Sequence, residues 1–112
     1  MKNKNIFLSN RTVLKISGSN YLNFLNNILT SDITKLKSKE ITPSALLTPQ
    51  GRILFDMLIS LGPVERINDL GCVFIECELT QAEDLLKKIN MYNLRKEVVI
   101  EKTSHKVSVT NN

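Results

Sequence analysis

The sequence predicts an α+β fold that combines a mainly antiparallel sheet with two helices. Two β-prone runs flank the turn sequence Pro49-Gln50-Gly51, which is typical of a hairpin. Two other stretches carry apolar residues at helical spacing, and the predicted strands do not alternate regularly with these helices. The 112 residues show no internal boundary, so they are expected to form one domain or one subdomain.

The first strand is expected at residues 12–17, where apolar and polar side chains alternate up to Gly18. Ser19 or Asn20 can then cap a helix, because a short polar side chain can accept a hydrogen bond from a free backbone N–H of the first turn. The helix should end near residues 30–32. Its apolar stripe indicates core packing rather than a ligand site, and consists of Tyr21, Leu22, Phe24, Leu25, Ile28 and Leu29.

A hairpin is predicted from residues 44–48 and 52–61. Proline suits an early turn position because its φ is fixed, and Gly51 can supply the positive φ that closes the turn. Both faces of the second strand are substantially apolar, which is typical of a strand covered on both sides. Asp56 lies between two leucines on its face, so we expect it to be only partly solvated and to need a charged or hydrogen-bonding partner.

Polar connections are expected at residues 33–42 and 62–71, before and after the hairpin. A strand follows at residues 72–79, with its odd-numbered apolar side chains, Leu79 included, facing the core. Two further short strands are expected at residues 97–102 and 106–110.

The second helix is the better specified of the two. Thr80 and Glu83 have the spacing of a capping box, in which each side chain binds a free backbone N–H of the first turn. Opposite charges four residues apart should add to its stability, and these pairs are Glu83 with Lys87 and Asp84 with Lys88. The residues expected to face inward are Ala82, Leu85, Leu86 and Ile89.

Composition excludes several classes of protein. The net charge of +4 comes from dispersed lysines, such as those at 35, 37 and 39, without interleaved aromatic residues, so no direct nucleic-acid partner is expected. No apolar run approaches the about 20 residues of a membrane helix, and the short apolar run near the N-terminus is no signal peptide. A cytoplasmic location without membrane contact is therefore expected.

The two cysteines are predicted to be free thiols. Cys72 and Cys77 lie at odd spacing in one strand, on opposite faces, so they cannot easily bridge to each other. His105 is too distant in sequence to complete a zinc site with them. No glycine-rich phosphate loop, metal motif or nucleophile elbow is present, so the residues alone name no reaction, no catalytic residue and no metal.

Several segments resemble a known family. Residues 11–18, 24–27 and 29–33 resemble the opening of the YgfZ branch of folate-binding proteins. Residues 46–56, LLTPQGRILFD, are similar to the hairpin motif of that branch, and residues 86–98 to its helix-to-strand segment. The matches run in order across nearly the whole chain, which makes them specific as a set.

The resemblance implies a T-protein-like (GcvT-like) folate-binding domain, related to the aminomethyltransferase of the glycine cleavage system. Residues 1–112 would be its N-terminal part, the first subdomain, without the second subdomain and the C-terminal barrel. The branch supports assembly or repair of iron–sulfur clusters and, through client enzymes, tRNA modification. The alternatives are a true aminomethyltransferase, or a binding remnant without folate. The cysteine of the branch's Lys-Gly-Cys signature has no counterpart here, so neither cysteine inherits its role.

The resemblance also implies a cofactor and a site. Tetrahydrofolate is expected to bind the full-length parent, and to bind this fragment weakly or not at all. Asp56, Tyr92 and Arg95 are the candidate cofactor-binding residues. Asp56 could instead be a structural partner of Arg52 or Arg95, and Arg95 could simply complement the end of a helix.

The expected partners are folate and iron–sulfur client proteins. The fragment by itself is expected to be marginally stable and to self-associate, because uncovered apolar surface and an open sheet edge both favour contacts between chains.

Overall fold

A computed structural model describes residues 4–7, 10–62, 71–103 and 108–111. It confirms the predicted α+β class, with a five-stranded antiparallel sheet and two helices. Most of the predicted 62–71 loop and the start of the predicted 106–110 strand lie outside the described residues. The elements are β1 (Lys4–Phe7), β2 (Arg11–Ser17), α1 (Tyr21–Ile28), a 3-10 turn (Ile33–Lys35), β3 (Ile41–Leu47), β4 (Ile53–Leu61), β5 (Cys72–Glu78), a second 3-10 turn (Leu79–Gln81), α2 (Ala82–Tyr92), β6 (Val99–Lys102) and β7 (Ser108–Asn111).

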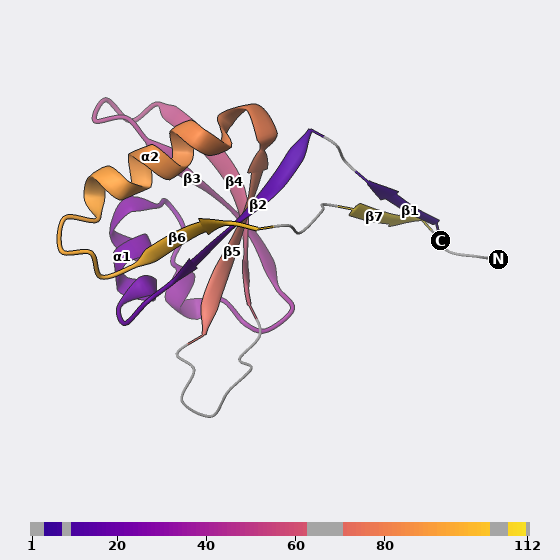
Figure 1. Cartoon of the computed structure of the whole chain (residues 1–112), viewed down its shortest axis with the longest axis horizontal. Helices are drawn as coiled ribbons and strands as arrows, with labels where there is room; N and C mark the ends of the chain where they lie inside the picture. The colour runs from indigo at the N-terminus through magenta and orange to yellow at the C-terminus, as the bar shows by residue number, and fades with distance from the viewer. Residues whose placement is uncertain (1–3, 8–9, 63–70, 104–107, 112) are drawn as a thin grey trace.

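The main sheet has the strand order β3-β4-β5-β2-β6, and every neighbouring pair is antiparallel. β5 and β6 both flank β2, so they run parallel to each other, and α2 forms the crossover between them. β1 and β7 pair in a separate two-stranded ribbon that projects away from the sheet (Figure 1). β1 has no counterpart among the elements predicted from the sequence.

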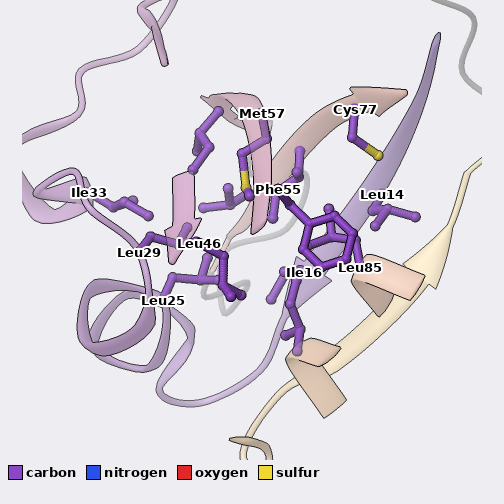
Figure 2. Packing of buried hydrophobic residues seen from close by; sticks show 14 of the residues in the cluster. Leu14, Ile16, Leu25, Leu29, Ile33, Leu46, Phe55, Met57, Cys77 and Leu85 are labelled. Atoms are coloured by element: carbon purple, nitrogen blue, oxygen red, sulfur yellow. The ribbon is translucent and has the colours of Figure 1, made fainter. Parts of the chain in front are cut away.

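Both helices pack on the same face of the sheet, and the core lies between them and the strands (Figure 2). Leu14 and Ile16 of β2 and Phe55 and Met57 of β4 point into this core from the sheet side. A fully buried side chain of this kind contributes about 1.5–3 kcal/mol through the hydrophobic effect. The buried residues that the helices contribute to the core are Tyr21, Phe24, Leu25, Ala82, Leu85 and Ile89.

The prediction that β4 is covered on both faces is wrong. Phe55, Met57 and Ile59 are buried on the helix-facing side, but on the other face Leu54 is 38% exposed and Asp56 is also exposed. No helix among the described residues covers this second face, because α1 and α2 both lie on the first. We call this second face the open face of the sheet.

The hairpin between β3 and β4 is confirmed, with a tight turn at residues 48–51. The Gly51 N–H donates to the carbonyl of Thr48 at 2.9 Å, and the Thr48 N–H donates to the carbonyl of Arg52 at 2.8 Å. Gly51 has a φ of +84°, as the turn chemistry predicts.

Neither helix is capped as the sequence predicts. Asn20 is the N-cap residue of α1, but its side chain binds no backbone N–H of the helix. A 3-10 turn precedes α2, so Gln81 takes the N-cap position and the Thr80–Glu83 capping box does not form. The same turn starts at Leu79, which is exposed rather than buried.

The ion pairs predicted along α2 are also absent from the described residues. Glu83 instead forms an ion pair with Lys102, which belongs to β6. Lys88 places its Nζ atom 5.7 Å from the centre of the Tyr92 ring. Glu83 therefore has a tertiary partner in place of Lys87, whereas Lys88 contacts a residue four positions further along the same helix.

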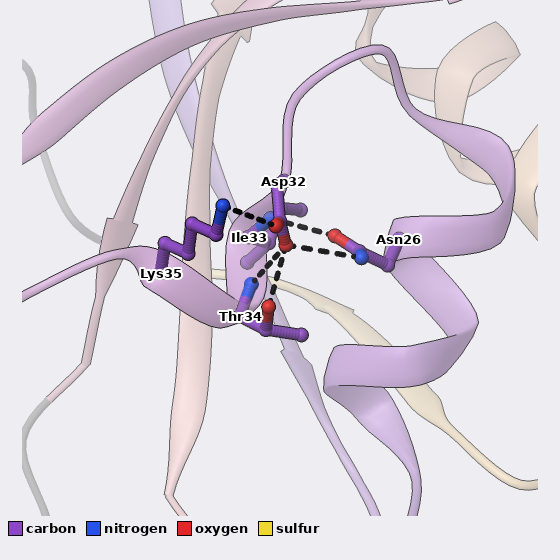
Figure 3. Close-up of polar contacts among 5 residues, drawn as sticks. All are labelled: Asn26, Asp32, Ile33, Thr34 and Lys35. Atoms are coloured by element: carbon purple, nitrogen blue, oxygen red, sulfur yellow. Dashed lines mark hydrogen bonds and ion pairs between the residues drawn. The ribbon is translucent and has the colours of Figure 1, made fainter.

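The segment after α1 is held by one carboxylate (Figure 3). Asp32 Oδ1 accepts hydrogen bonds from the Thr34 hydroxyl at 2.5 Å, the Thr34 N–H at 3.1 Å and the Asn26 side chain at 3.1 Å. The side-chain oxygen of Asn26 accepts from the Ile33 N–H at 2.6 Å, while Lys35 lies 3.8 Å from Asp32. Asn26 and Asp32, with the backbone of the 3-10 turn, thus fix the connection from α1 to β3.

Candidate functional site

A hollow lies between α1, the end of α2 and the loop that follows α2. Its volume is about 370 Å³, within the size range of small-molecule sites. Its walls combine aromatic and aliphatic side chains with three amides, a guanidinium and a carboxylate. The residues that line it are Asn20, Phe24, Asn27, Ile28, Tyr92, Asn93, Leu94, Arg95 and Glu97. We call it the Tyr92 hollow.

The loop at residues 93–97 is held in place at three points. The Asn93 side chain binds both backbone groups of Val98, donating to its carbonyl at 2.8 Å and accepting from its N–H at 3.3 Å. Asn20 donates from Nδ2 to Glu97 Oε2 at 3.2 Å. Gly18 packs so closely on the loop that a Cβ there would lie 2.8 Å from the Val98 Cα.

The structure brings Tyr92 and Arg95, two of the three predicted site residues, into this one hollow. Tyr92 is 44% exposed, so much of its ring is available to a ligand. Arg95 is exposed and forms no ion pair within the described part of the chain. It follows the C-terminal end of α2, as the sequence predicts.

Asp56, the third predicted site residue, lies elsewhere. It belongs to the open face of the sheet, whereas the Tyr92 hollow is formed on the helix side. The expectation that Asp56 is only partly solvated is wrong, because nothing described covers that face. Among the described residues, Asp56 forms no ion pair with Arg52 or Arg95, so the structural pairing does not form either.

The charged pair on the open face joins β2 to β5. Arg11 donates to Glu76 Oε2 from Nε at 3.0 Å and from Nη2 at 2.8 Å, in a partly buried setting. Because both donors engage the same carboxylate, this pair braces two neighbouring strands. It lies outside the Tyr92 hollow.

Both cysteines are free and buried, as predicted. Burial raises the pKa of the Cys77 thiol, which keeps it protonated and therefore a weak nucleophile. Within the described residues, no group of three or more His, Cys, Asp or Glu could hold a metal ion. Among the same residues, no helix has the length and apolar character needed to cross a membrane.

Sequence reasoning missed four polar residues of the hollow, which are Asn20, Asn27, Asn93 and Glu97. Asn20 and Glu97 are 77 positions apart in the sequence, so no local spacing could connect them. Asn20 was expected as a helix cap, and its side chain instead reaches the loop after α2.

The sheet with its two helices on one face is similar to part of the fold of a glycine cleavage system aminomethyltransferase. The solved structure of glycine cleavage system aminomethyltransferase T from Bartonella henselae is similar over 97% of this chain, with a TM-score of 0.79. Sequence identity is 16%, and the chain spans 28% of the length of that protein. The comparison confirms the GcvT-like fold, while the YgfZ branch stays a prediction.

No protein-family model matches the sequence, and no curated protein matches it.

Proposed function

We propose that this chain is part of a folate-binding protein, and that the Tyr92 hollow holds part of a reduced folate. One observation carries the proposal: Tyr92 and Arg95, on the segment that resembles folate-binding proteins, line the same hollow. The similarity in fold to an aminomethyltransferase T supports the same class of ligand.

The chemistry of the hollow suits a reduced folate. A flat pterin can stack on the exposed Tyr92 ring, and its polar edge can bond to the side chains of Asn20 and Asn27. Glu97 uses one oxygen for Asn20, which leaves the other to accept from pterin N–H groups. Arg95 can pair with a carboxylate of the glutamate tail, because a guanidinium matches a carboxylate in shape and charge.

The proposed site is tested by calorimetric titration with 5-formyltetrahydrofolate. The longer protein that contains this chain should bind it, and the 112-residue chain should bind weakly or not at all. Arg95→Ala should weaken binding about tenfold through loss of a charge-assisted bond. Lys96→Ala is the matched control, because it removes the same charge from a neighbouring residue that does not line the hollow. Equal affinity of the Arg95→Ala variant and the unaltered protein would make Arg95 a structural residue.

Asp56 is tested in the same titration. Asp56 lies on the opposite face of the sheet from the Tyr92 hollow, so the alternative placement that it tests has the folate bound against the open face, in a pocket closed by segments outside this chain. Asp56→Asn should then weaken binding, whereas unchanged affinity would remove Asp56 from the site.

At a finer level, we assign the parent protein to the YgfZ branch, as a cytoplasmic protein that supports iron–sulfur cluster assembly or repair. The hairpin motif at residues 46–56 supports this assignment. Phe55-Asp56 retains one acid where the T-protein has a pair, and aminomethyl transfer needs proton movement at the folate nitrogen. Measured aminomethyl transfer by the longer protein would favour the alternative function.

A further inference from the structure

The main sheet has two edge strands, and the outer side of β3 is covered. The Thr30 N–H donates to the Ala45 carbonyl at 3.0 Å, and the Thr30 hydroxyl accepts from the Ala45 N–H at 3.0 Å. The Ser31 hydroxyl donates to the carbonyl of Pro43 at 2.7 Å, and Pro43 itself has no N–H to offer. Residues 29–31 therefore occupy the place of a sixth strand, which protects this edge.

The other edge strand, β6, has no strand on its outer side among the described residues. The Thr103 N–H donates to the carbonyl of Val13 at 3.2 Å, so these two residues form a hydrogen-bonded antiparallel pair. Such pairs alternate along a ladder, so Val99 and Glu101 direct their backbone groups toward β2. The N–H and C=O groups of Ile100 and Lys102 then point outward, and within the described chain nothing binds them.

The open stretch of β6 has a defined beginning. Two residues before Ile100, the backbone groups of Val98 also point outward, and both are bonded to the Asn93 side chain. The amide of Asn93 thus imitates the peptide group of a neighbouring strand at that one position. An incoming strand can pair with Ile100 and Lys102, but not with Val98.

A second hollow, of about 490 Å³, lies beside this edge. Its apolar wall is formed by Val98, Val99 and Ile100, and Val99 is 54% exposed. Lys96 is its one charged lining residue, and the remaining lining residues are Asn90 and Asn93. A free strand edge beside a partly apolar hollow is the arrangement by which proteins bind extended peptides through strand addition.

We propose that the β6 edge is a strand-addition site for an extended, acidic segment of another protein. Backbone bonds to Ile100 and Lys102 supply the pairing, an apolar side chain enters the second hollow, and a carboxylate meets Lys96. The acidic character follows from charge, because the hollow offers a cation and no acidic side chain.

A second copy of this chain fits the edge poorly. In a symmetric antiparallel pair of two β6 strands, the outward backbone groups of one copy must face those of the other. This condition leaves three registers. Pairing Ile100 with Lys102 places Glu101 directly opposite Glu101 of the second copy, and pairing Lys102 with itself opposes two ammonium groups. Pairing Ile100 with itself brings Lys102 against Val98, where the Asn93 side chain already sits. Each register therefore carries a repulsion or an obstruction.

The test uses the 112-residue chain and a blocked six-residue peptide of alternating glutamate and valine, followed by amide hydrogen exchange. At saturating peptide, exchange at Ile100 and Lys102 should slow about tenfold or more. Exchange at Val99 and Glu101, already bonded to β2, should change little. A fully N-methylated peptide of the same sequence cannot donate to the edge and should not bind. A lysine–valine peptide should bind at least about tenfold more weakly.

A protein variant adds a second arm. Ile100→Pro removes one outward N–H from an edge strand, where proline is tolerated, and should abolish peptide binding. Ile100→Val keeps the N–H and should bind as the unaltered chain does. If Ile100→Pro unfolds the chain, the comparison of the N-methylated with the unmethylated peptide tests the proposal by itself.

Three results would overturn the proposal: unchanged exchange at Ile100 and Lys102, equal binding of the N-methylated peptide, or tighter binding of the lysine peptide. Protection of both amides that appears without peptide and increases with protein concentration would identify a second copy of the chain as the occupant. That result would also overturn the proposal.

Discussion

Among single residues, Asp32 links the stability of the fold to pH. Hydrogen bonds from the side chains of Thr34 and Asn26 lower its pKa below the ordinary value of 3.8. A carboxyl whose pKa is lower in the folded state contributes stability above its unfolded pKa, and that contribution is lost as the pH falls through the folded pKa.

We therefore expect the free energy of unfolding to decrease below about pH 4, in part because Asp32 becomes protonated. Asp32→Asn should flatten this decrease, and Thr34→Val should flatten it less, because the backbone N–H of Thr34 remains. Urea unfolding at a series of pH values measures both effects. An Asp32→Asn chain with an unaltered pH profile would show that the network in Figure 3 is not coupled to folding.

Two glycines with positive φ provide a matched pair of substitutions. Gly18 (φ +130°) leaves no room for a Cβ against the backbone of Glu97 and Val98, whereas a Cβ on Gly51 (φ +84°) would contact nothing within 4 Å. Gly51→Ala should cost about 1 kcal/mol through backbone strain alone. Gly18→Ala should cost about 2 kcal/mol or more, because it adds a steric clash to the strain. Denaturant unfolding of both variants checks the order, and equal losses would contradict the close packing of Gly18 on the loop.

For secondary-structure elements, sequence patterns predicted strands and helices well and their local contacts poorly. The strands at residues 12–17 and 52–61 match β2 and β4 within one residue at each end, because alternation is a local signal. The capping box at Thr80 failed because the last residue of β5 leads directly into a 3-10 turn. Contacts with other elements, such as Glu83 with Lys102, decided which local pairs formed.

The cover over the β3 edge gives a test at this scale. Thr30→Val keeps the shape of the side chain but removes the oxygen that accepts from the Ala45 N–H, and should lower the free energy of unfolding by about 1 kcal/mol. Thr80→Val is the control, because the Thr80 side chain caps no helix, and should have an effect near zero. A larger loss of unfolding free energy for Thr80→Val than for Thr30→Val would indicate that Thr80 caps the helix after all.

For the whole molecule, the open face of the sheet is the surface we expect to cause self-association of the isolated chain. One edge of the sheet is covered and the other pairs poorly with itself, so we expect contact between open faces instead. Leu54→Lys should lower the mass measured by light scattering at high protein concentration, because it places a charge on that face. Met91→Lys, which alters an exposed apolar residue on α2, should not. A monomeric unaltered chain would refute the expectation.

The candidate site was predictable in part. Tyr92 and Arg95 follow from the helix-to-strand segment that resembles folate-binding proteins. They are close in sequence, so the end of α2 and the loop after it bring both to the hollow. Asn20 and Glu97 belong to segments that meet only after α1 and the loop following α2 have packed together. Asp56 was assigned to the same site as Tyr92 and Arg95, but the pleat of β4 turns it to the other face of the sheet.

The sequence by itself determined the α+β class, the hairpin at Gly51, the core faces of β2 and β5, and the free state of both cysteines. These features depend on local periodicity and turn chemistry, which short stretches of chain encode. Only the tertiary structure decided that both helices cover one face, that β3 is sealed while β6 is open, and that Asp56 lies apart from Tyr92. Those outcomes depend on which distant segments compete to bury the same apolar surface, and no local pattern records that competition.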